Sequence, residues 1–248
     1  MNLSNKELDM NKLVKYIIKN FFINYKKGIV GAFIAGIVLF ISMTNVDLHR
    51  ASLIDLFQSV YSGNLILITF ILLFIFVISN IFKVYDKNIL LIRCFNLHTW
   101  CYQKILTCVY VVLIYLFFIN FPFLFSLIVH NFIGSITFDF IRFWMISILF
   151  QGMGFMIIGS LYLLIRNLTG HNVISSVLTY LIISIPNLIQ GLFYVRVYSF
   201  ADYMFLNNLN KDSTIVSISV LLIVFVIIEM LLLYLNLNIV QKKDIYLE

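Results

Sequence analysis

The residue with the clearest chemical potential in this sequence is Glu229, a carboxyl group near the middle of a long apolar run. An ionised carboxylate at the centre of a bilayer costs about 2.5 kcal/mol or more, so such a group faces the interior of a helix bundle or a wet cavity. Asn236, seven residues on, shares its helical face, and Gln151 with Ser147 forms another polar face in a separate apolar run. These residues predict either the polar lining of a translocation path or hydrogen bonds that hold the helices together.

Residue patterns that carry out catalysis or bind metals do not occur in the sequence. It contains no G-x-x-x-x-G-K-[ST] loop for nucleotide phosphates, no H-E-x-x-H and no G-x-S-x-G. The four histidines alternate between the two predicted sides of the membrane, and Cys94, Cys101 and Cys108 form no C-x-x-C pair. We therefore expect reduced thiols, no bound metal or cofactor, and no enzymatic activity in this chain.

The stretch from Lys83 to Lys104 is the only sizeable charged segment that lies between long apolar runs. It carries four basic residues against a single acid, Asp86, and it also holds a set of large apolar residues. This mixture predicts a short amphipathic helix with its basic side toward lipid headgroups or water and its apolar side toward a partner or the bundle. A helix that only floats on the membrane surface would show the same pattern.

The composition places all these residues in a membrane protein. The chain of 248 residues is 62% hydrophobic and 11% charged, whereas about a quarter of the residues of a soluble domain are charged. Its apolar runs are long and uninterrupted, which favours spanning helices over the short alternating strands of a barrel. The basic residues lie at the ends of apolar spans, so the net charge of +6 does not indicate nucleic-acid binding. We expect an all-α integral membrane protein.

Six apolar segments have about the 17 to 25 residues that a bilayer needs. They are approximately 28–44, 64–82, 105–128, 140–165, 172–190 and 214–238. An even number of spans puts both termini on one side, and thirteen of the 17 lysines and arginines fall on that side. The positive-inside rule therefore predicts cytoplasmic termini and a cytoplasmic location for residues 83–104.

Three further segments have patterns typical of membrane proteins. Ser4 and Glu7 have the S-x-x-E spacing of a capping box, and residues 5–27 separate an apolar face from a lysine-bearing face, which predicts an amphipathic interfacial helix. Residues 191–212 hold six aromatic residues and predict either short helices that dip into the outer leaflet or a plain aromatic belt. Gly28, Ala32 and Gly36 have small-xxx-small spacing, which indicates close helix packing within the bundle or against a second copy.

The order of these parts resembles the type-2 permeases of ATP-binding cassette exporters over nearly the whole chain. The run YDKNILLIRCFNLHTWCYQKIL is similar to the family's cytoplasmic helix and the start of its third span. The run QGMGFMIIGSLYLLIRNLTGHN is similar to the fourth span and following turn of small peptide and lantibiotic permeases. The resemblance implies a coupling helix at 83–104, a connecting helix at 10–27 and extracellular hairpin helices at 191–212.

The same resemblance implies a set of residues that dock on a separate ATPase. They are Asp86, Lys87, Leu90, Ile92, Arg93, Phe95, His98 and Trp100. Asp86 stands where the family often has a glutamate. The implied partners are a cytoplasmic ATP-binding subunit that holds the ATP and Mg, a second permease copy or paralogue, membrane lipid and an amphipathic peptide substrate.

The function that follows is a permease subunit in a bacterial cell membrane, which exports a hydrophobic or amphipathic peptide with energy from ATP hydrolysed elsewhere. The alternative is a carrier or channel that is driven by an ion gradient and needs no ATPase. Strong dependence of transport on Glu229 would favour this alternative.

Overall fold

The computed structural model describes residues 52–61, 67–87, 97–129, 134, 136–194, 198–207 and 215–245, together with Lys19. All regular structure in these residues is helical. The elements are α2 (Leu53–Val60), a π-helical turn (Leu67–Ile71) that runs into α4 (Leu72–Lys87), α6 (Leu97–Val129), α7 (Phe138–Thr169), α8 (Asn172–Phe193), α9 (Phe200–Met204) and α10 (Ile215–Ile245).

Four of these helices, α6, α7, α8 and α10, are long and apolar enough to cross a membrane. The prediction of an all-helical fold is thereby confirmed for the described residues, and their length and apolar composition fit a membrane protein. The last four predicted spans overlap these helices, and the second overlaps a shorter apolar helix, Ile68–Lys83. The first predicted span, 28–44, and the interfacial helix, 5–27, lie outside the described residues, as do Gly28, Ala32 and Gly36.

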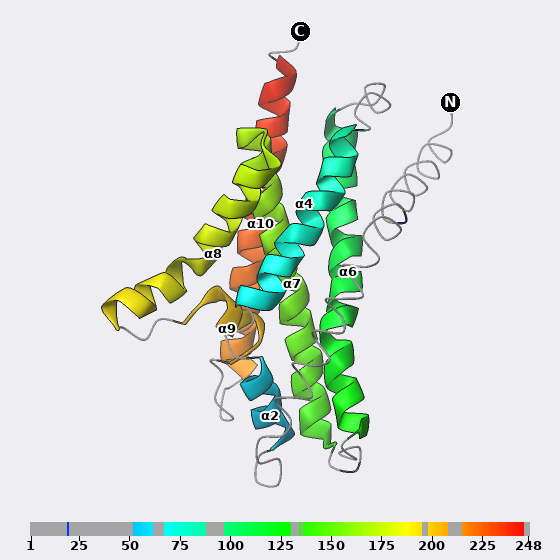
Figure 1. Cartoon of the computed structure of the whole chain (residues 1–248), viewed down its shortest axis with the longest axis vertical. Coiled ribbons are helices and arrows are strands. Elements are labelled where there is room, and N and C mark those ends of the chain that lie inside the picture. The colour runs from blue at the N-terminus through cyan, green and yellow to red at the C-terminus, as the bar shows by residue number, and fades with distance from the viewer. Residues whose placement is uncertain are drawn as a thin grey trace.

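The helices α4, α6, α7, α8 and α10 alternate in direction along the bundle (Figure 1). One end collects the C-terminal ends of α4, α7 and α10 and the N-terminal ends of α6 and α8. We call it the basic end, because Lys83, Lys104, Arg166 and Lys242 belong to the helix ends that meet there. The short helix α2 lies toward the opposite end, and α9 lies above it, beside the first turns of α10 (Figure 1).

Helix α7 is the central element, since it contacts α2, α4, α6, α8, α9 and α10. Two glycines allow these neighbours to come close. A methyl group added at Gly154 would clash with the side chain of Met204 in α9, and one added at Gly159 would clash with Cys108 Sγ in α6. Small residues at helix contacts let backbones approach in this way.

Both ends of α7 are fixed by local sequence. The Thr137 side chain accepts a hydrogen bond from the backbone N–H of Phe140 at 3.2 Å and caps the first turn. Gly170 adopts the left-handed conformation at φ 72° and donates its N–H to the Arg166 carbonyl at 2.9 Å, which closes the last turn. The turn into α8 is therefore short and sits at the basic end.

The predicted cytoplasmic helix over residues 83–104 has only its two ends among the described residues. Residues 83–87 continue α4, and residues 97–104 form the first turns of α6. Both ends of the predicted segment are thus extensions of long helices, because nothing in their sequence breaks a helix. The connection between α4 and α6 is residues 88–96.

The predicted aromatic segment over residues 191–212 is described up to residue 194 and again over 198–207. Helix α8 extends to Phe193, and the short helix α9 packs against α7. Ala201, Met204 and Phe205 are each fully buried and belong to the main hydrophobic core. Phe200 of α9 stacks on Phe225 of α10 with ring centroids 5.4 Å apart, whereas Tyr194 at the end of α8 is 94% exposed.

Candidate functional site

A first polar cluster links α7 to α10 in the half of the bundle nearer the basic end. Ser160 Oγ donates a hydrogen bond to Glu229 Oε1 at 2.7 Å. Two turns further along α10, Asn236 Nδ2 donates to the Ser160 carbonyl at 3.0 Å, and its Oδ1 accepts from Asn167 Nδ2 at 3.0 Å. The seven-residue spacing of Ser160 and Asn167 on one helix matches that of Glu229 and Asn236 on the other.

A second polar cluster links α7 to α6 in the other half of the bundle. Asn120 Nδ2 donates to Gln151 Oε1 at 2.9 Å, and Gln151 Nε2 donates to Ser147 Oγ at 3.1 Å. Trp144 Nε1 donates to Asn120 Oδ1 at 3.3 Å. Asn120, Ser147 and Gln151 are all buried, so these amides satisfy one another away from lipid.

The two clusters lie on nearly opposite faces of α7. Ser147 and Ser160 are 13 residues apart, which at about 100° per residue is a rotation of about 220°. Gln151 consequently faces α6, while Ser160 faces α10. Glu229 of α10 is therefore hydrogen-bonded to Ser160, and Gln151 is hydrogen-bonded to Asn120 of α6.

Arg166 joins α7 to the end of α4. The side chain is 4% exposed, its Nη2 donates to the Phe82 carbonyl at 2.9 Å, and its guanidinium lies 5.7 Å from the centre of the Phe82 ring. A planar cation on an aromatic ring adds attraction to the hydrogen bond. This contact lies one turn before the end of α4, close to the point where residues 88–96 begin.

A cluster of aromatic residues, which we call the aromatic cap, lies away from the basic end of the bundle. It consists of α2 with Tyr61 and of α9 with Phe205. Gln58 Nε2 donates to the Leu206 carbonyl at 3.0 Å, Asn207 Nδ2 donates to the Tyr61 carbonyl, and the Tyr61 and Phe205 rings stack at 5.0 Å. The capping box of Ser52 and Asp55 starts α2, but neither the helix nor its burial was predicted. The S-x-x-D spacing is the signal that could have revealed it.

The aromatic cap is anchored on α6 near its proline. Tyr61 Oη donates to the Ile119 carbonyl at 2.9 Å, three residues before Pro122. A proline inside a helix removes one backbone donor, and neighbouring side chains can supply another in that region. Tyr61 is 1% exposed, and its burial raises the pKa of the phenol, which is held as a neutral donor.

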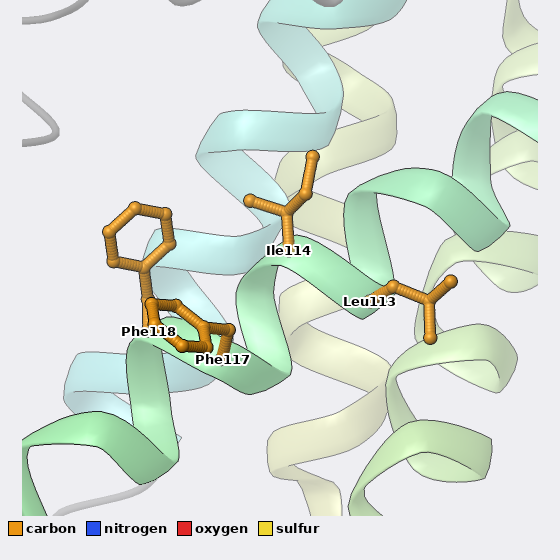
Figure 2. A pocket seen from close by; sticks show the side chains of 4 residues that line it. All are labelled: Leu113, Ile114, Phe117 and Phe118. Carbon is orange, nitrogen blue, oxygen red and sulfur yellow. The ribbon is translucent and has the colours of Figure 1, made fainter.

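The outer surface of α6 carries a shallow apolar hollow. It is lined by Leu113, Ile114, Phe117 and Phe118, whose side chains project from successive turns (Figure 2). Its lining has no charged side chain, so it offers hydrophobic contact alone. The polar clusters lie elsewhere, on faces of α7.

The predicted coupling residues divide into two groups. Asp86 and Lys87 are in the last turn of α4, and His98 and Trp100 are in the first turn of α6. Leu90, Ile92, Arg93 and Phe95 lie outside the described residues. The described residues contain no group of three His, Cys, Asp or Glu side chains that could hold a metal ion.

No protein family, curated protein or solved structure matches this chain.

Proposed function

We propose that this chain is the permease subunit of an ATP-driven exporter and moves a hydrophobic or amphipathic peptide out of the cell or its membrane. ATP and Mg belong to a separate cytoplasmic subunit, which docks on residues 88–96 and the helix turns that flank them. The observation that carries the proposal is that the C-terminal end of α4 and the N-terminal end of α6, which residues 88–96 join in the chain, both lie at the basic end. Basic ends of spanning helices face the cytoplasm by the positive-inside rule.

Contacts between helices would pass a movement of the docking segment on to the rest of the bundle. A force on residues 88–96 acts first on α4 and α6, and both contact α7. The hydrogen bond from Arg166 to Phe82 and the hydrogen bond from Asn120 to Gln151 join α7 to these two helices. A displaced connection would therefore move the central helix.

The remaining partners follow from the same proposal. A second copy of this chain, or a paralogue, completes the path along which the peptide crosses the membrane. Both termini face the cytoplasm, and the complex lies in a bacterial cell membrane. The size and general likeness of the chain resemble membrane subunits of exporters for phenol-soluble modulins, which are amphipathic helical peptides.

The test is co-purification with a candidate ATPase after replacing Ile92, Arg93 and Phe95 by alanine. We expect loss of the ATPase from the complex and loss of peptide-stimulated ATP hydrolysis. The matched control replaces Ile141, Arg142 and Phe138, which are the same three residue types, exposed at the opposite end of the bundle. Normal assembly of the first variant, or equal loss in the control, would overturn the proposal.

One observation favours the second candidate, a carrier or channel driven by an ion gradient. Glu229 places a single carboxyl group inside the bundle between α7 and α10. Peptide or ion transport by proteoliposomes that contain this protein alone, abolished by Glu229→Gln, would select this function over the first.

A further inference from the structure

The interface between α7 and α10 satisfies only one of the two oxygens of Glu229. Oε1 accepts the hydrogen bond from Ser160 Oγ at 2.7 Å. Oε2 is enclosed by protein and has no hydrogen-bond partner in the described part of the chain. An ionised carboxylate with a single donor in an apolar environment is far more costly than a neutral acid that lacks one hydrogen bond.

The charged and titratable groups around Glu229 do not replace the missing donor. Helix α10 packs mainly on α7 and α6. From α6, the buried thiol of Cys108 lies against Gly159, the neighbour of Ser160, and Lys104 is one turn earlier in the same helix. From α7, Tyr162 lies two residues beyond Ser160 and bonds Asn172, and Arg166 bonds the Phe82 carbonyl.

Neither oxygen of Glu229 accepts a hydrogen bond from a lysine or arginine in the residues described. On α10 itself the next basic residue of the helix is Lys242, 13 positions away, which is about 20 Å along the axis at 1.5 Å per residue. The charge of an ionised Glu229 would thus have no direct counterion.

We infer that Glu229 is a proton-binding site, held as a neutral carboxylic acid between α7 and α10. Ser160 donates to Oε1, and Oε2 carries the proton. Release of that proton leaves a carboxylate that needs water or a second donor, so ionisation must open the contact between the two helices locally. The inference goes beyond the proposed function, because it concerns the chemistry of this contact whichever energy source drives the protein.

Infrared spectroscopy of the full chain in lipid nanodiscs tests this assignment at neutral pH. We expect a carbonyl stretching band of a protonated carboxyl group in the wild-type protein, and we expect Glu229→Gln to remove it. Because glutamine has the shape of the neutral acid and its Oε1 can still accept from Ser160, this variant should fold.

Two further variants keep the test decisive. Ser160→Ala removes the hydrogen bond to Oε1 and should shift the band to higher frequency without removing it. Asp139→Asn changes an exposed carboxyl group in the first turn of α7 and should leave the band unchanged. If Glu229→Gln fails to fold, the shift in Ser160→Ala still assigns the band.

Absence of a protonated-carboxyl band from the wild-type protein at neutral pH would overturn the inference, as would a band that is unaffected by both Glu229→Gln and Ser160→Ala. The readout is a vibrational band and involves neither ATPase nor peptide. Its failure is therefore distinguishable from failure of the proposed export function.

Discussion

Gly159 sets the distance between α7 and two of its neighbours. A methyl group at this position would clash with Cys108 Sγ and would lie 3.1 Å from Ile78 Cδ1. Both of those side chains are buried, so neither can swing into open space. Extra atoms in a packed interior force neighbouring side chains or backbone to shift.

We expect Gly159→Ala to lower the free energy of unfolding by about 1–3 kcal/mol, which is typical of overpacking. Equilibrium unfolding in mixed micelles measures this change. Gly191→Ala is the matched control, because a methyl group there meets no atom within 4 Å. The double variant Gly159→Ala with Cys108→Ala should recover part of the loss, and equal destabilisation by Gly191→Ala would contradict the packing argument.

At the residue scale the sequence predicted which polar residues lie in the bundle but not their partners. Glu229 and Asn236 were placed on one helical face from their spacing, and the structure has them on one face. The partner on α7 is Ser160, whereas the sequence singled out Gln151. Spacing along one helix predicts the shared face, but only the rotation of the neighbouring helix determines which residue meets it.

At the scale of elements, the aromatic cap depends on the hydroxyl group of Tyr61, whose pKa is raised by burial. Tyr61→Phe keeps the ring stacked on Phe205 but loses the hydrogen bond to the Ile119 carbonyl. We expect a loss of about 0.5–1.5 kcal/mol in the free energy of unfolding at neutral pH, which is the usual net worth of a hydrogen bond.

The effect of this variant should depend on pH. Burial raises the pKa of Tyr61 above the ordinary value of about 10. Above that pH the unfolded chain loses a proton that the folded chain retains, so the stability of the wild-type protein falls as pH rises. Phenylalanine has no such proton, so the difference between the two proteins should narrow in alkali, and a constant difference would contradict the assignment.

The elements themselves were predictable to different degrees. The four helices that can cross a membrane were identified because their apolar runs exceed the length that a bilayer requires. The ends of these helices were not predicted. Helix α10, for example, continues past Lys242 to Ile245, because a lysine can end an apolar run without ending the helix. The short helix α2 escaped prediction because eight residues give little periodicity, and its burial depends on contacts with α9, almost 150 positions later in the chain.

At the scale of the whole molecule, the two ends of the bundle should face opposite sides of the membrane. His171 in the turn between α7 and α8, and Lys242 near the end of α10, belong to the basic end, while Gly134 lies between α6 and α7 at the other end. All three residues are exposed.

We expect single cysteines at His171 and Lys242 to react with a membrane-impermeant maleimide from the same side, and one at Gly134 to react only from the opposite side. The three native cysteines are replaced by alanine in all three variants, and labelling after lysis shows that each introduced thiol can react. Labelling of all three positions from one side of intact cells would contradict the arrangement.

The central place of α7 also bears on how the protein is made. Spanning helices leave the ribosome in chain order, so α4 and α6 enter the membrane before α7 has been synthesised. Until then Asn120 lacks Gln151, and the Phe82 carbonyl lacks the Arg166 guanidinium. Before α7 arrives, these two groups have only the hydrogen bonds within their own helices, such as that from Asn120 Nδ2 to the Leu116 carbonyl. A pause in translation after the codons for α7 would allow α7 to pack against α4 and α6 before α8 and α10 are made.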